Sequence, residues 1–182
     1  MTSPLLVAFA GGTSGRWRVE RVAAVRGQGL PNVERLDVIE GAARPAPTVV
    51  WVLRGSTGHE RYVNQIEHRA LSERQPRLGR EEAARAALIP IRKSDAWWNL
   101  SQDLRREIFE ERSHHIRIGL DYLPRVARRL HHSRELGEPF DFLTWFEFAP
   151  SDAEAFEELV ARLRKTEEWR YVEREVDIRL AR

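Results

Sequence analysis

The first quarter of the chain consists of short stretches in which apolar residues are consecutive or alternate with polar ones. Residues 5–10 form an apolar run closed by two glycines, and residues 48–53 form a second run. Residues 16–26 and 35–40 alternate between apolar and polar positions. Because successive side chains of a strand point to opposite faces, this period of two predicts strands. The Gly, Pro and Asn residues between the stretches predict hairpin turns.

The middle of the chain carries helical signals. Beyond His59, Tyr62 and Ile66 lie four positions apart, as on one face of a helix. Residues 81–88 are rich in good helix formers and predict a second helix. Residues 101–112 predict a third helix, because their apolar positions again recur at helical spacing.

The last third of the chain returns to strands. Residues 125–132 alternate, residues 140–148 are rich in aromatic side chains, and residues 172–180 alternate between apolar and charged positions. Ser151 and Glu154 have the spacing of a capping box in front of an apolar helix face. Alternating strands mixed with helices predict an α+β domain, in which a curved antiparallel sheet or barrel carries helices on its outside.

Length and charge narrow the class of protein. The 182 residues suffice for one domain, 1–182, which we expect to contain two loosely similar halves, 1–80 and 81–182. No apolar run approaches the ~18–20 residues of a membrane helix, and the start has no positively charged leader. We therefore expect a cytoplasmic protein. The net charge of +2 is spread along the chain, which does not indicate nucleic-acid binding.

Composition also limits the chemistry. The chain has no cysteine, which excludes disulfides, thiolate metal sites and a cysteine nucleophile. Met1 is its only methionine. A protein without easily oxidised side chains suits work near a strong oxidant, although codon usage alone could produce the same composition. Phosphate-binding loops, dinucleotide fingerprints, and the H-E-x-x-H and G-x-S-x-G motifs are missing from the sequence.

Histidines are the remaining candidates for metal chemistry. Neighbouring side chains point in different directions on a helix or a strand, so at most one member of an adjacent pair can face a given site. Taken singly, each histidine is more simply explained as structural. The six are His59, His68, His114, His115, His131 and His132.

Several motifs occur together in a fixed order. Residues 89–101 read IPIRKSDAWWNLS, which matches I-P-x-x-K-S-x-x-W-[WY]-x-L-S. The adjacent histidines, Gly119, and the stretches YLP and VARRL follow, and residues 163–167 read LRKTE, which matches L-R-x-T-E. In these motifs, over about residues 48–182, the chain resembles the superfamily of chlorite dismutases and coproheme decarboxylases.

The resemblance implies two ferredoxin-like halves that form an antiparallel β-barrel with helices outside and haem b in the C-terminal half. The short N-terminal half is similar to that of the compact, dimeric branch. The resemblance also implies that His115 is the axial ligand of the haem iron and that Arg128, 13 positions later, lies above the iron. At the same spacing His114 would pair with Ala127, whose side chain cannot take the role of the arginine above the iron.

Further roles follow from the same resemblance. A glutamate should accept a hydrogen bond from the other nitrogen of His115; Glu168 is favoured over Glu167. Lys93, Trp97 and Tyr62 match residues that hold haem propionates and line the pocket, and Trp98 matches a neighbouring haem contact. The candidate apolar walls of the pocket are Leu123, Phe142, Leu143 and Trp145.

The implied activity is that of a haem b-dependent enzyme that converts chlorite to chloride and dioxygen. It would proceed through ferryl haem and a transient hypochlorite held by Arg128, in a homodimer without nucleic-acid or membrane partners. A coproheme decarboxylase is the nearest competing interpretation, but Trp98 stands where those enzymes use a tyrosine. The sequence also leaves open a haem carrier or sensor without turnover, and a cofactor-free oxygenase of the dimeric α/β-barrel type.

Overall fold

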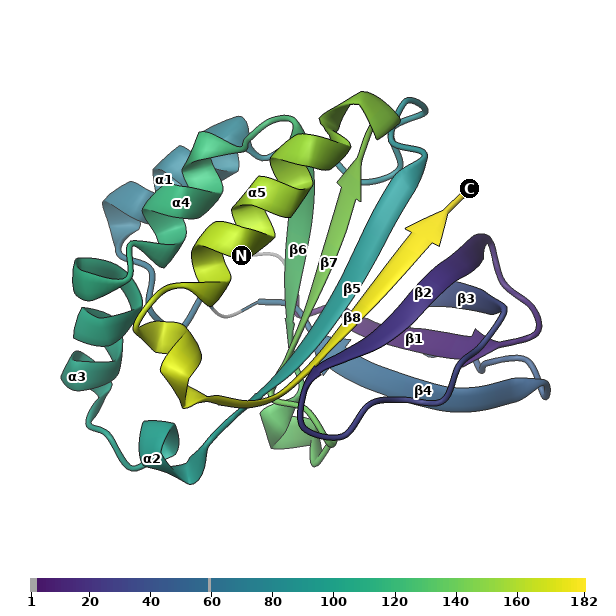
Figure 1. The fold of residues 1–182 in the computed structure, drawn as a ribbon, viewed down its shortest axis with the longest axis horizontal. Helices are drawn as coiled ribbons and strands as arrows, with labels where there is room; N and C mark the ends of the chain where they lie inside the picture. The colour runs from purple at the N-terminus through teal and green to yellow at the C-terminus, as the bar shows by residue number, and fades with distance from the viewer. Residues whose placement is uncertain (1–2, 59) are drawn as a thin grey trace.

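The computed structural model describes residues 3–58 and 60–182. Within these residues eight strands form a closed antiparallel barrel in the order β1-β3-β2-β8-β5-β7-β6-β4 (Figure 1). The strands are β1 (Leu6–Gly12), β2 (Trp17–Arg26), β3 (Arg35–Glu40), β4 (Val49–Ser56), β5 (Arg85–Lys93), β6 (Val126–His132), β7 (Phe142–Phe148) and β8 (Val172–Ala181).

Helices cover one side of this barrel. Figure 1 shows α1, α4 and α5 beside β6 and β7, whereas the strands β1 to β4 extend beyond them at the other end of the molecule. The α-helices are α1 (Gln65–Arg74), α2 (Asp95–Trp98), α3 (Gln102–Arg106), α4 (His115–Asp121) and α5 (Ala153–Arg164). A π-helical turn, η1 (Glu107–Arg112), and the 3₁₀ turns η2 (Arg134–Leu136), η3 (Pro150–Asp152) and η4 (Glu168–Tyr171) complete the set.

The α+β fold class and the strands expected from alternation are confirmed. A helix is also present within residues 101–112, as α3 followed by η1. The helical signal around Ile66 corresponds to α1, and His59 lies outside the described residues.

Two local predictions are wrong. Residues 85–88 of the expected helix 81–88 belong to β5, where Ala86, Ala87 and Leu88 are buried between β7 and β8. Pairing on both edges and burial on both faces outweigh the modest helix propensity of these residues. The capping box at Ser151 does not form, because α5 begins after a 3₁₀ turn and makes no side-chain cap. A capping box does form at α1, between Asn64 and Glu67.

The strands β5 to β8 separate two apolar layers. Their inward side chains fill the barrel with residues such as Leu88, Trp145 and Ile178, packed against Phe9 and Trp17 of the N-terminal strands. Their outward side chains pack against α4 and α5. The outer layer includes Ile89, Ile91, Phe142, Phe146, Phe156, Leu159 and Leu163. Both faces of these strands are therefore buried, which is what a sheet covered by helices requires.

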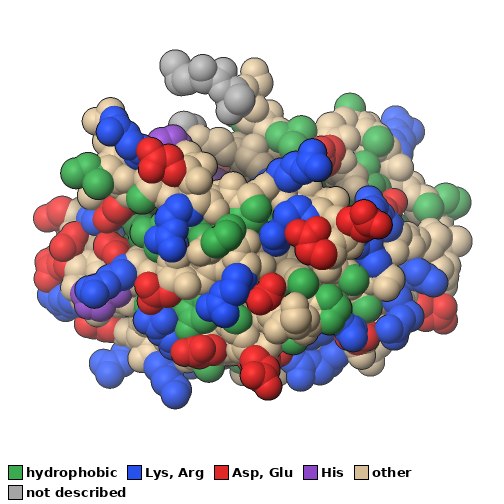
Figure 2. All heavy atoms as spheres, turned by 90° about the horizontal axis from the view of Figure 1, so that it is seen from above, with side chains coloured by type: hydrophobic (Ala, Val, Ile, Leu, Met, Phe, Trp, Pro, Cys, Tyr) green, Lys and Arg blue, Asp and Glu red, His purple; other side chains and the backbone are tan. Residues whose placement is uncertain are grey.

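The surface carries both signs of charge. Figure 2 shows acidic and basic side chains interspersed over the face that it draws, as expected from their distribution along the sequence. None of the helices in the described part of the chain is both long enough and apolar enough to span a membrane.

Candidate functional site

A cavity of about 670 Å³ lies in the outer layer, between the strands β5 to β7 and the helices α1, α4 and α5. Its wall is largely apolar, with a few polar groups, which is the usual make-up of a small-molecule site. The apolar lining includes Ile89, Ile91, Phe109, Phe142, Phe146 and Leu163. The polar lining includes Tyr62, Lys93, His115, Arg128, His132 and Glu168.

A sharp change in chain direction places His115 at this cavity. The π-helical turn η1 ends at Arg112, and His114 then adopts a left-handed conformation with φ of 53°. Helix α4 starts at His115, and the carboxylate of Glu110 accepts hydrogen bonds from the first free N–H groups of the helix, at 2.6 Å from Ile116. His114 is exposed, whereas His115 lines the cavity.

Glu168 holds both His115 and Lys93. Its Oε2 lies 2.7 Å from Nδ1 of His115, and its Oε1 accepts a hydrogen bond from Nζ of Lys93, also at 2.7 Å. The backbone N–H of Glu168 donates to Oγ of Ser113 at 2.9 Å, which ties the turn η4 to the chain just before His115. Nδ1 of His115 is therefore occupied, which leaves Nε2 as the ring nitrogen that can bind a metal.

The electrostatics of this triad favour a charged carboxylate. Burial alone would raise the pKa of Glu168, but the neighbouring His115 and Lys93 outweigh burial and lower the pKa to about 2. Burial lowers the pKa of Lys93, while Glu168 opposes that shift. A carboxylate that stays ionised behind an imidazole makes the imidazole a more electron-rich ligand.

The structure separates the two glutamates that the sequence left open. Glu168 is buried against His115, whereas Glu167 lies at the surface and accepts a hydrogen bond from Arg112 at 3.2 Å. The ammonium group of Lys93 lies 4.2 Å from the ring centre of Trp97, and the residue as a whole is 3% exposed. Lys93 is thus a member of the triad through its bond to Glu168. Its contact with a haem propionate stays a prediction.

Arg128 projects from β6 toward the helix that carries His115. Its guanidinium packs on Gly119, where an added Cβ would lie only 2.4 Å from Nη1, so a larger residue at 119 would displace the guanidinium. It forms no hydrogen bond or ion pair with any side chain in the part of the chain that is described, and burial lowers its pKa, an effect that the more distant Glu60 and Glu110 oppose. A guanidinium stays charged even so, and a half-buried charge beside a cavity, with no ion pair to a described residue, is a natural receptor for an anion.

The residues fit a ligand with carboxylate groups. Oη of Tyr62 and Nε1 of Trp97 are buried and have no hydrogen-bond partner within residues 3–58 and 60–182. The two rings meet edge to face with centres 5.8 Å apart. Buried donors usually have partners, so the unsatisfied hydroxyl of Tyr62 at the cavity wall indicates that a ligand group, such as a porphyrin propionate, completes it.

Several expected contacts lie elsewhere. Trp97 and Trp98 do not line the cavity; Trp98 lies behind Phe142, with ring centres 6.1 Å apart. Among the candidate walls only Phe142 lines the cavity. Leu143 and Trp145 point into the barrel, because they have the opposite strand parity, and Leu123 packs in a separate cluster with Leu71 and Ile116.

Two aromatic residues next to His115 were missed by sequence reasoning. The ring of Phe109 stacks on His115 with centres 4.4 Å apart, and the indole of Trp169 lies nearly parallel to the imidazole at 6.3 Å. Trp169 directly follows Glu168, and this adjacency could have marked it. Nothing in the sequence marks Phe109, because its contact depends on the π-helical turn.

The closed antiparallel barrel has an outer cavity that presents a carboxylate-backed histidine and an arginine with no ion pair to the described residues. These features define an α+β barrel protein with a candidate ligand site between sheet and helices. The chain belongs to the chlorite dismutase family, whose model matches residues 40–182.

Two solved structures and one curated relative are similar to this chain. A dimeric chlorite dismutase from Nitrobacter winogradskyi is 57% identical, with a TM-score of 0.89 over 97% of this chain and 99% of that chain. A variant chlorite dismutase from Candidatus Nitrospira defluvii, 20% identical, shares the fold with a TM-score of 0.71 over 98% of this chain and 91% of that one. A curated chlorite dismutase from Ideonella dechloratans is 37% identical over 86 residues, which span 47% of this chain and 28% of that relative.

Proposed function

We propose that this chain is a haem b-dependent chlorite dismutase that converts chlorite to chloride and dioxygen. The observation that carries the proposal is the arrangement of His115, Glu168 and Arg128 around one cavity. The 57% identical neighbour that bears the name chlorite dismutase supports it over 97% of the chain. That neighbour is described as dimeric, so we propose a homodimer as well.

The residues have distinct proposed roles. Nε2 of His115 would bind the haem iron, and Glu168, held by Lys93, would keep the imidazole oriented and electron-rich. The unsatisfied hydroxyl of Tyr62, which lines the cavity, would bind a propionate. Haem iron, when bound, supplies an open coordination position and the redox chemistry that removes oxygen from chlorite.

Arg128 would act on the anions of the reaction. Chlorite and hypochlorite each carry a negative charge, and the guanidinium can bind either one at any working pH. The apolar wall of the cavity excludes water and strengthens this attraction. By holding hypochlorite at the site, Arg128 would keep it from escaping, and so would determine both oxygen yield and enzyme lifetime.

One experiment tests the proposal. Protein supplied with haem should show a Soret band, and an oxygen electrode should record gas on addition of chlorite. His115→Ala should lose the Soret band, while the neighbouring His114→Ala, which alters an exposed histidine, should keep it. A wild-type protein that binds haem but releases no oxygen from chlorite would refute the enzymatic proposal. Loss of haem from His114→Ala in place of His115→Ala would refute the ligand assignment.

A further inference from the structure

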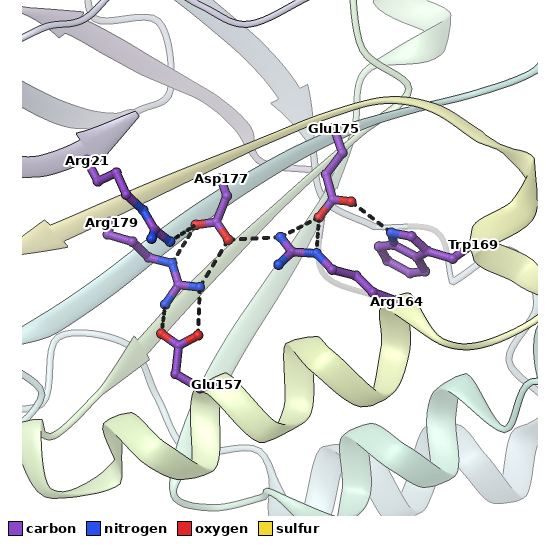
Figure 3. A network of polar contacts seen from close by, with 7 residues as sticks. All are labelled: Arg21, Glu157, Arg164, Trp169, Glu175, Asp177 and Arg179. Carbon is purple, nitrogen blue, oxygen red and sulfur yellow. Dashed lines mark hydrogen bonds and ion pairs between the residues drawn. The ribbon is translucent and has the colours of Figure 1, made fainter. Parts of the chain in front are cut away.

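A ladder of alternating charges runs along the outer face of β8 beneath α5 (Figure 3). It starts at the exposed Glu157, which pairs with Arg179, and Arg179 binds Asp177. Arg164 then bridges Asp177 and Glu175, with contacts of 2.8 Å to Asp177 and 2.6 Å to Glu175. The two carboxylates on β8 are each 1% exposed, so both charges are fully desolvated.

The inner end of the ladder reaches the cavity. Nε1 of Trp169 donates a hydrogen bond to Oε2 of Glu175 at 2.8 Å, and Figure 3 shows this contact at the end of the chain of ion pairs. The indole lies nearly parallel to the imidazole of His115, with an angle of 24° between the rings. Phe109 stacks on the same imidazole at 21°. Glu175 is thus linked to His115 through a single side chain.

Stability alone is a weak explanation for this arrangement. A buried ion pair loses in desolvation much of what it gains in attraction, so apolar residues of similar size could fill the space as well. What an apolar residue could not do is accept the hydrogen bond of a buried indole in one fixed orientation. Each oxygen of Glu175 has a partner, so the carboxylate cannot turn away from Trp169.

We propose that Glu175, fixed by Arg164, is a positioning residue that holds Trp169 against His115, and that this contact sets the orientation and reduction potential of an iron bound by His115. The inference rests on the proposed haem function. An indole whose N–H donates to a carboxylate is enriched in electron density, and groups that surround an axial ligand tune its iron. Loss of the carboxylate should therefore raise the potential.

The test measures haem-loaded variants by spectroelectrochemistry and by electron paramagnetic resonance of the ferric form. Glu175→Gln, which keeps an acceptor but not the charge, should raise the potential, and Glu175→Leu should raise it further. Trp169→Phe should shift the ferric spectrum in the same direction as Glu175→Leu. The Trp169→Phe, Glu175→Leu double variant should shift it no further than the larger single effect, since both act through one contact.

Asp177→Asn is the matched control. Asp177 is as buried as Glu175, lies on the same face of β8 and shares Arg164, but it makes no bond to Trp169. It should change the unfolding midpoint while leaving the ferric spectrum close to wild type. If Glu175→Gln and Asp177→Asn alter the spectrum and the potential equally, or neither alters them, the ladder is only structural and the inference is wrong.

Failure of the proposed function can be told apart from failure of this inference. If wild-type protein takes up no haem, the proposed function fails. The contact between Trp169 and His115 can then still be tested in haem-free protein by the indole ¹⁵N–¹H resonance of Trp169. Its displacement in both Glu175→Gln and His115→Ala supports positioning. A resonance that Glu175→Gln moves and His115→Ala leaves unchanged refutes it.

Discussion

The two faces of β6 treat their arginines in opposite ways. The strand carries Arg128-Arg129 and His131-His132. Arg129 donates to Glu40 at 2.7 Å and to Nε2 of His131 at 3.0 Å, and His131 donates from Nδ1 to the carbonyl of Leu143 at 2.9 Å. Arg128, one position away, packs on Gly119 with no ion pair in the described residues. The hydrogen bonds of Arg129 give it a structural role. Arg128 lies beside a cavity without such a bond to the described residues, which points to a functional role.

The same division appears in other adjacent pairs. His115 lines the cavity and His114 is exposed; Glu168 binds His115 and Glu167 binds a surface arginine. Composition cannot distinguish the members of such pairs. Their backbone geometry can, because one step along a strand or a helix turns the side chain to another face.

Separate replacement of Arg128 and Arg129 should give the largest difference in chlorite turnover. Arg128→Ala in haem-loaded protein should lower chlorite turnover by about 100-fold, the usual effect of removing one donor from a charged transition state. It should also shorten the lifetime of the enzyme, because hypochlorite escapes. An oxygen electrode measures both quantities.

Arg129→Ala is the matched control for this change. It removes the hydrogen bonds to Glu40 and His131, so it should lower the free energy of unfolding while leaving haem-loaded turnover within a few-fold of wild type. Equal turnover of Arg128→Ala and wild type would end the assignment of Arg128 as the anion receptor. Equal losses in the two variants would mean that the faces of β6 do not differ in function.

Local patterns predicted the strands because period two and burial agree in them. The failed helix at 81–88 shows the limit: Ala86, Ala87 and Leu88 favour a helix in isolation, but two neighbouring strands far away in sequence pair with them. For the site, motif spacing proposed His115 and Arg128. The choice between Glu167 and Glu168, the stacking of Phe109 and the ladder on β8 depend on how η4 and α5 pack, which no local pattern encodes.

A fall in pH should lower the free energy of unfolding through the barrel interior and through the cavity layer over different pH ranges. Burial is the main cause that lowers the pKa of His131 to about 4 from its ordinary value of 6.5. The unfolded chain therefore binds a proton more readily, so the contribution of neutral His131 is present above pH 6.5 and is lost as the pH falls toward 4. For Glu168 the corresponding loss runs from 4.5 down to about 2.

The window of His131 corresponds to about 3 kcal/mol of unfolding free energy. Urea unfolding at a series of pH values measures it. His131→Asn should flatten the dependence between pH 6.5 and 4, and Glu168→Gln should flatten it only below pH 4.5. If both variants flatten the same window, the barrel interior and the cavity layer do not titrate independently.

The smallest effect is expected at His114, the exposed member of its pair. A non-glycine residue in the left-handed region costs roughly 1 kcal/mol, and glycine removes that cost while giving back part of it as entropy of the unfolded chain. His114→Gly should therefore raise the free energy of unfolding by less than about 1 kcal/mol and leave the Soret band of haem-loaded protein unchanged. Arg117→Gly, at an exposed position inside α4, should lower it by about 1 kcal/mol. If His114→Gly destabilised the protein as much as Arg117→Gly does, the imidazole of His114 would be contributing contacts of its own, and the division between the two adjacent histidines would be less complete than the geometry indicates.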